Sequence, residues 1–161
     1  MKKWLCLLLA CLLLTGCASA SETAAPTVRD TEPEPVILSV YVPDETAEGF
    51  VKREVEVPDI TESVITDQLI LAGVLAEGTR VNSLELVSGS DAPELLVDFN
   101  TALRDRILSQ GTAGEYVTLG SVVNTFLTAY GAQSMVITVE GQPLESGHAV
   151  YDAPLPFFDP Q

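Results

Sequence analysis

The sequence predicts an α+β fold, a two-layer sandwich in which a small mixed β-sheet carries two amphipathic helices on one face. Two observations lead to this class. Short segments rich in β-branched residues are bounded by proline, glycine and aspartate, which is typical of strands. Two longer segments instead repeat apolar residues at helical spacing. The order of elements is strand, strand, helix, strand, strand, helix, strand.

The first two strands are expected at residues 36–42 (VILSVYV) and 50–57, which are stopped by Pro43 and Pro58. The helix that follows should run to about Leu75. Asp59-x-x-Glu62 is predicted to form a reciprocal cap at the start of this helix, and Gly78 lies where the helix should stop.

The central part of the chain predicts a hairpin of strands at residues 80–87 and 95–99, joined by the turn at 88–91. Residues 101–108 suit a short helical turn. The second main helix should begin at the capping box Thr112-x-x-Glu115 and end at Gly131. A strand at 135–139 follows it, and residues 142–158, with three prolines, are expected to be loose.

The N-terminus has the pattern of an export signal. Lys2 and Lys3 precede the apolar run 4–14, which as a helix would span about 16 Å, too short for a hydrocarbon core of about 30 Å. The junction Leu14-Thr15-Gly16-Cys17 resembles the bacterial lipobox. Residues 1–16 are therefore predicted to be a signal peptide, and Cys17 the residue that carries a diacylglyceryl lipid with palmitate-type chains; a plain signal with an incidental cysteine is the alternative.

Beyond the signal we expect a lipidated cysteine with a flexible tether at 17–35 and a single domain at 36–158. The tether is rich in Ala, Ser, Thr, Pro and Glu, and buries too little apolar surface to fold. The net charge of −15 argues against nucleic-acid binding, because phosphate backbones require Lys and Arg. It also argues against docking on anionic headgroups, so the lipid on Cys17 would hold the chain at the membrane.

No pattern in the sequence indicates catalysis, a cofactor or a metal. His148 has neither a nucleophile motif nor an evident orienting acid, and is interpreted as a loop residue. Asp98 alternates with Val97 and Phe99, so it should face solvent or cap the next turn; a catalytic role would need a second carboxylate, for which Asp105 is the nearest candidate. The prediction is that the protein is not an enzyme.

Six phrases, in order, resemble the GerMN domain of sporulation and spore germination proteins over residues 36–158. They are VYVP (40–43), LILAG (69–73), GTRVNS (78–83), LVDFN (96–100), VVNTFL (122–127) and VITVEGQ (136–142). The resemblance implies a non-catalytic envelope lipoprotein that supports sporulation, germination or cell-envelope assembly through protein contacts.

Three functional hypotheses follow. The first is a lipid-anchored interaction module on the extracytoplasmic face of the cell membrane, with envelope proteins or a second copy as partners; a strand edge at Val136 is one surface for such pairing. The second is a solute- or peptidoglycan-binding lipoprotein, for which the binding residues are unknown. The third is an unrecognised hydrolase. The scattered aromatic residues favour the first over the second.

Overall fold

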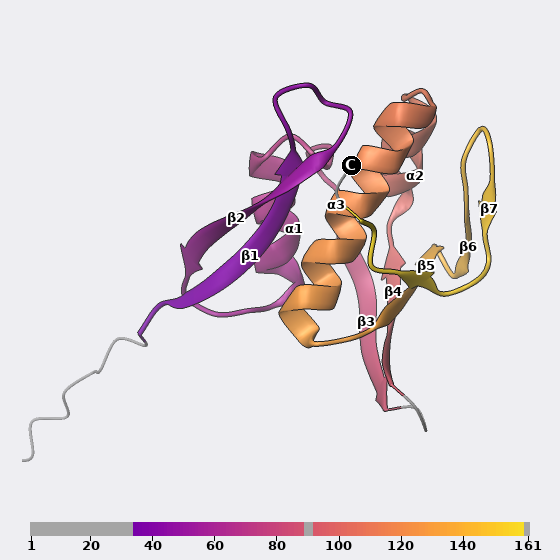
Figure 1. Cartoon of the computed structure of the whole chain (residues 1–161). Helices are drawn as coiled ribbons and strands as arrows, with labels where there is room; N and C mark the ends of the chain where they lie inside the picture. Colours follow the sequence, from indigo (N-terminus) through magenta and orange to yellow (C-terminus); the bar gives the residue numbers. More distant parts are fainter. Residues whose placement is uncertain (1–33, 89–91, 160–161) are drawn as a thin grey trace, which may run out of the picture. The chain divides into compact units, whose positions relative to one another are not determined.

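The computed structural model describes residues 34–88 and 92–159, which form eight strands and three helices (Figure 1). The predicted signal peptide and Cys17 lie outside the described residues. In chain order the elements are β1 (Val36–Pro43), β2 (Phe50–Val57), α1 (Glu62–Leu71), β3 (Val81–Ser88), β4 (Pro93–Phe99), α2 (Thr101–Leu108), α3 (Thr112–Tyr130), β5 (Ser134–Val139), β6 (Gln142–Glu145), β7 (Val150–Tyr151) and β8 (Leu155–Pro156).

The strands form two sheets, and the predicted α+β sandwich is confirmed. β1 and β2 pair with each other in a separate antiparallel hairpin. The larger sheet has the order β3-β4-β5-β6-β7 and is mixed, because β4 and β5 are parallel whereas β3 is antiparallel to β4. β8 pairs with the start of β5. Val136 therefore lies in an inner strand, so the edge proposed there from the sequence is wrong.

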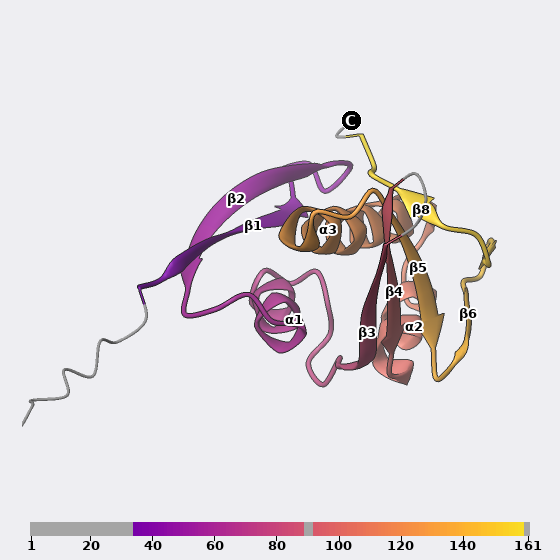
Figure 2. The same cartoon turned by 90° about the horizontal axis from the view of Figure 1, so that it is seen from below.

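Helix α3 lies between the hairpin and the larger sheet (Figure 2). Every residue from Val117 to Leu127 is buried, whereas an amphipathic helix would leave one face in water. On the sheet side, the Phe126 ring meets Phe99 edge to face at 5.8 Å between centroids. On the hairpin side, Gly120 packs against Phe50. The sequence predicted a helix with a single buried face. α3 is instead buried on two sides, because the β1–β2 hairpin forms a separate layer opposite the larger sheet.

Two consecutive polar residues of α3 hold the segments on either side of it. The Thr125 hydroxyl accepts a hydrogen bond from the Tyr41 amide of β1 at 2.9 Å. The buried Asn124 amide bonds both backbone groups of Phe158, each at 2.8 Å. Because unpaired backbone groups are costly to bury, these side chains take the place of ladder partners. The sequence predicted a loose C-terminal segment. The segment is instead held by the two bonds between Asn124 and Phe158 and by the pairing of β6, β7 and β8.

The first helix differs from the prediction at both ends. Thr61, not Asp59, is its N-cap, and the Thr61 hydroxyl accepts from the Val64 amide at 3.3 Å. The helix ends at Leu71 because Gly73 adopts a positive φ of 74°. Arg106 of α2 then donates to the carbonyls of Gly73 and Val74 at 3.0 and 3.1 Å. The arginine thereby stabilises a turn whose own carbonyls would otherwise lack partners.

Candidate functional site

Asp98 lies at the centre of a polar cluster on the larger sheet. Its Oδ1 accepts from the Thr138 hydroxyl at 2.6 Å and from the Gly141 amide at 2.7 Å, and its Oδ2 accepts from the Asn82 side chain at 2.9 Å. These donors belong to β5, to the turn after it and to β3. Asp105 is not among the partners. The carboxylate thus joins three strands and a turn, which is a structural role.

The electrostatics of Asp98 agree with that role. Partial burial alone would raise the pKa of the carboxyl, but the hydrogen bonds from Thr138, the Gly141 amide and Asn82 outweigh it and hold the pKa below its ordinary value of 3.8. The anion is therefore favoured in the folded state, and Asp98 is unsuited to act as a proton donor near neutral pH.

We expect Asp98→Asn to destabilise the fold by about 1–3 kcal/mol at neutral pH, because one acceptor oxygen becomes a donor that faces other donors. Since the folded pKa is depressed, the wild-type advantage is complete above pH 3.8 and is lost as the pH falls through the folded pKa. Urea denaturation at several pH values measures this. Asp105→Asn, at an exposed position of α2, is the control and should change stability by less than about 0.5 kcal/mol. Equal effects of the two changes would contradict the argument.

A second cluster joins the start of α3 to the C-terminal strands. Glu115 is only 4% exposed, and its carboxylate accepts a hydrogen bond from the Tyr151 hydroxyl. His148 Nδ1 lies 3.9 Å from the other Glu115 oxygen. The capping box predicted here is wrong: Thr112 is already helical, and the N-cap is Gly111 without a side-chain bond. Glu115 instead bonds a residue 36 positions away, which no local pattern could indicate.

This second cluster does not form a nucleophilic triad. Ser146 Oγ accepts from the backbone amides of His148 and Ala149 at 3.0 and 2.9 Å, so the hydroxyl stabilises a turn. Burial and then the hydrogen bond and charge of Glu115 raise the pKa of Tyr151 to about 12, which makes the phenol a poor base. Within the described part of the chain, no three His, Cys, Asp or Glu residues gather as metal ligands.

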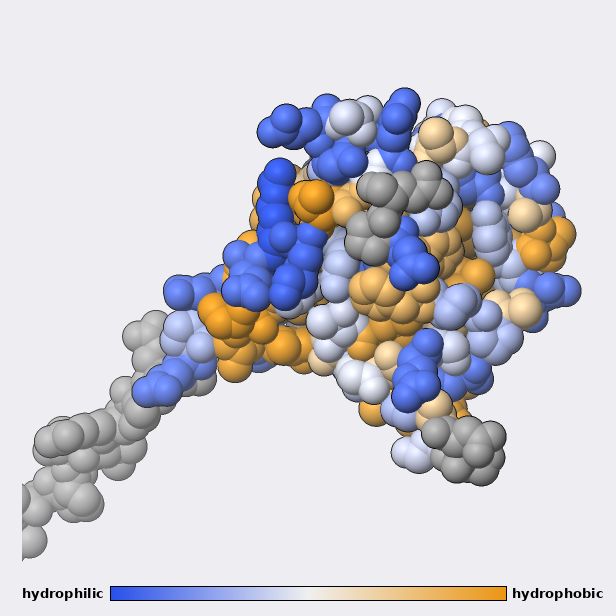
Figure 3. Space-filling model, viewed as in Figure 1, coloured by the Kyte–Doolittle hydropathy of each residue, from blue (hydrophilic) through white to orange (hydrophobic). Residues whose placement is uncertain are grey.

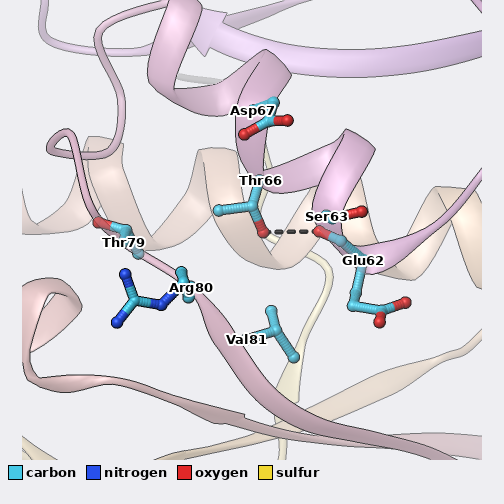
Figure 4. Close-up of a pocket in the computed structure, with 7 residues that line it drawn as sticks. All are labelled: Glu62, Ser63, Thr66, Asp67, Thr79, Arg80 and Val81. Atoms are coloured by element: carbon cyan, nitrogen blue, oxygen red, sulfur yellow. Dashed lines mark hydrogen bonds between the residues drawn. The ribbon is translucent and has the colours of Figure 1, made fainter.

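A recess of about 230 Å³ lies between α1 and the start of β3 (Figure 4). Its lining residues are Glu62, Ser63, Thr66, Asp67, Thr79, Arg80 and Val81. The buried hydroxyls of Thr66 and Thr79 donate to backbone carbonyls at 2.6 and 2.7 Å, so neither is available to a ligand as a donor. The recess is smaller than the roughly 300–1,000 Å³ of most ligand pockets. It offers charged groups at its rim without an enclosed interior.

A wider recess of about 420 Å³ lies at the turn of the β1–β2 hairpin. It is lined by Pro43, Asp44, Glu45, Thr46, Val51 and Arg53. The Asp44 carboxylate is already used by the turn, since its Oδ1 accepts from the Thr46 amide and hydroxyl at 2.9 and 2.7 Å. As in the other clusters, the polar groups serve the chain itself. None of the helices in the described ranges is long and apolar enough to cross a membrane.

The fold and its polar clusters define a small α+β domain whose polar side chains hold its own strands and turns together. The family model for sporulation and spore germination, Germane, matches residues 39–145. The chain therefore belongs to the Germane family, and the resemblance stated from the sequence phrases is confirmed. No curated protein matches the chain in sequence.

Three solved structures resemble the fold. The tandem GerMN domains of the sporulation protein GerM from Bacillus subtilis match with a TM-score of 0.53 and 18% identity over 85% of this chain, which spans 50% of that tandem. The first GerMN domain of the same protein gives 0.49 and 15% over 78% of this chain and 96% of that one. A Clostridium perfringens protein described provisionally as a lipoprotein gives 0.45 and 16%, over 76% and 88%. At these identities the likeness to the GerM tandem concerns the fold alone.

Proposed function

We propose that this protein is a lipoprotein on the extracytoplasmic face of the cell membrane, held by a diacylglyceryl group on Cys17. Its signal would be residues 1–16, its tether 17–35 and its single domain 36–158. The lipobox residues Leu14-Thr15-Gly16-Cys17 support the anchor. Two acyl chains hold a protein at a membrane far longer than one, because each buried methylene contributes about 0.8 kcal/mol.

The domain is proposed to act without catalysis, through contacts with other proteins during sporulation, germination or envelope assembly. One observation carries this proposal: within the described residues, every buried side-chain nitrogen and oxygen atom except the Ser121 hydroxyl has a hydrogen-bond partner in the fold. Asp98 bonds three donors, Glu115 bonds Tyr151, and Asn124 bonds Phe158. What remains for function is the surface. Membership of the Germane family supports the biological setting.

The alternative is a solute- or peptidoglycan-binding lipoprotein, for which the recess of Figure 4 is the supporting observation. It presents the guanidinium of Arg80 and the carboxylates of Glu62 and Asp67, groups that could contact zwitterionic peptide stems. Isothermal titration calorimetry of the protein with muropeptides tests this alternative. Binding that Arg80→Ala weakens at least tenfold would favour this alternative over the interaction module.

Metabolic labelling with a fatty-acid probe tests the anchor. We expect the wild-type chain to be labelled and to remain with the membrane fraction, and Cys17→Ser to lose the label. Cys6→Ser, in the predicted signal, is the matched control and should keep it. Labelling that persists in Cys17→Ser, or is lost in Cys6→Ser, would contradict the assignment of Cys17 as the lipid attachment site.

A further inference from the structure

We propose that the outer edge of β2 is a docking surface for a second copy of this chain, whose own β2 pairs with it antiparallel about a two-fold axis at Arg53. The inference rests on the proposed function as an interaction module and names the partner. β2 is a regular eight-residue strand whose outer edge has no partner strand in the described residues.

β2 pairs only with β1 among the described residues, and the register runs from Val36↔Val57 to Pro43↔Phe50 without a shift. Four consecutive side chains, from Val51 to Glu54, are exposed. The outer edge of β1, in contrast, is covered by α3 through the bond from the Tyr41 amide to Thr125. An eight-residue strand with an open edge is a template for another strand.

The bond to Thr125 also shows which groups of β2 point outward. In an antiparallel pair, hydrogen-bonded and non-hydrogen-bonded pairs of opposite residues alternate along the strands. In a non-hydrogen-bonded pair, the amide and carbonyl of each residue point away from the other strand. Tyr41 points its amide away from β2, so its opposite residue, Lys52, must point its own amide and carbonyl away from β1. By alternation, the outward backbone groups of β2 belong to Phe50, Lys52, Glu54 and Glu56.

One antiparallel register pairs all of these outward groups. With the two-fold axis at Arg53, Lys52 lies opposite Glu54 of the second copy, and Phe50 lies opposite Glu56 of the second copy. Each Lys–Glu pair occurs twice by symmetry, and opposite charges across strands are favourable. The only residue that meets itself is Arg53, whose long exposed side chain can turn away from its equivalent. A register with the two-fold axis at Glu54 would instead place Glu54 opposite Glu54 of the second copy, which is unfavourable for two like charges.

The charge distribution favours β2 as the meeting point of two acidic molecules. The chain has eight basic and twenty-three acidic residues, and two of the basic ones, Lys52 and Arg53, are adjacent in β2. With Glu54 and Glu56 the strand is neutral overall, so it avoids the repulsion that acidic surfaces would have. In the described part of the chain the larger sheet ends at β3 and at the two-residue strand β7. The register of β3 shifts between Val81 and Ser83, a feature that blunts edge pairing.

Apolar surface beside this edge would be covered by the same pairing. A groove of about 180 Å³ between the hairpin and α1 is lined by Val40, Val42, Arg53, Val55, Gln68, Leu71 and Ala72. Leu71 is 78% exposed and Val51 is 45% exposed. In the proposed register Val51 lies opposite Val55 of the second copy, on the face of the groove. Figure 3 shows the hairpin from the side away from α1, where hydrophilic and apolar surfaces adjoin.

Cysteine cross-linking of the full chain in membranes tests the register. Arg53→Cys meets its own equivalent at a Cα separation of about 4.5 Å in a non-hydrogen-bonded pair, which a disulfide can span. Glu56→Cys lies in the same strand, but about 20 Å from its equivalent in this register. With a copper–phenanthroline oxidant we expect a disulfide-linked dimer from Arg53→Cys, at least fivefold above Glu56→Cys and wild type. Equal cross-linking of both variants, or none, overturns the proposal.

Charge reversal tests the Lys52–Glu54 pairs. In the Arg53→Cys background, Lys52→Glu places like charges opposite each other twice and should lower the dimer yield about tenfold. Adding Glu54→Lys should restore it. Failure of the double variant to recover, while circular dichroism shows an unchanged fold, contradicts the pairing.

The outcomes separate this inference from the proposed function. A disulfide from Arg53→Cys to a different protein would refute the second copy as the partner and leave the interaction module standing. Loss of the lipid label or a turned-over substrate would refute the proposed function itself, whatever the cross-linking shows.

Discussion

Replacing Gly120 by alanine should destabilise the domain by about 1–3 kcal/mol, although glycine-to-alanine changes inside helices ordinarily stabilise. A Cβ at Gly120 would lie 2.3 Å from Cε1 and 2.8 Å from Cζ of the Phe50 ring. That ring is 1% exposed and packs against Tyr41 and Tyr116, at centroid distances of 6.3 and 6.0 Å. It cannot turn aside, so the hairpin must move away from α3.

Gly114 of the same helix provides the matched control. Its added Cβ would lie 3.1 Å from Cβ of Gln110, a contact far milder than that at Gly120, which a movement of a few tenths of an ångström relieves. Gly114→Ala should therefore leave the stability unchanged or raise it slightly. Urea denaturation followed by circular dichroism compares the two variants. A Gly120→Ala protein as stable as Gly114→Ala would show that the contact between α3 and Phe50 is looser than described.

The strands were predictable because local composition decides them. The apolar runs that became β4 and β5 bury alternate residues, whereas β1 also buries Tyr41 between Val40 and Val42. Asp98 lies half-buried between the buried Val97 and Phe99, as its spacing required. The phrases that suggested the family lie in these strands, in α1 and α3, and at the start of β3. The strands and the family phrases could both be recognised because each depends only on residues that are adjacent in the sequence.

The remaining features depend on partners far along the chain. The capping box at Thr112 was wrong because the helix begins at Thr112 itself, with Gly111 as its N-cap, and Glu115 bonds Tyr151 instead. Gly120 looked like an ordinary helical residue until the separate hairpin brought Phe50 against it. The short strands β6, β7 and β8 carry little propensity of their own. β6 and β8 form against β5, and β7 forms against β6. Sequence periodicity cannot report such long-range pairings.

The pair formed by Glu115 and Tyr151 gives the second large expected effect. Tyr151→Phe should cost about 1–3 kcal/mol at neutral pH, because it leaves a carboxylate that is 4% exposed without its hydroxyl donor. Tyr116→Phe is the control: its hydroxyl bonds the Asp159 carbonyl at 2.9 Å in an exposed position, where water can replace it. Urea denaturation of both variants distinguishes a buried partner from a surface one.

The pH dependence gives this prediction a sign. Burial, followed by the hydrogen bond and charge of Glu115, raises the pKa of Tyr151 from 10 to about 12. A raised folded pKa means that the neutral phenol stabilises the fold fully below pH 10, and that this contribution is lost as the pH rises through about 12. The stability gap between wild type and Tyr151→Phe should therefore narrow between these values. Ultraviolet titration of the phenols should show a late component that Glu115→Gln shifts to lower pH, since removing the charge favours the phenolate. Burial and the charge of Glu62 also raise the pKa of Tyr130, which Glu115→Gln should leave unchanged. A Tyr151 that ionises near 10 in the wild-type protein would mean that Glu115 does not accept its proton, and the C-terminal strands would then be held on α3 by Asn124 rather than by this pair.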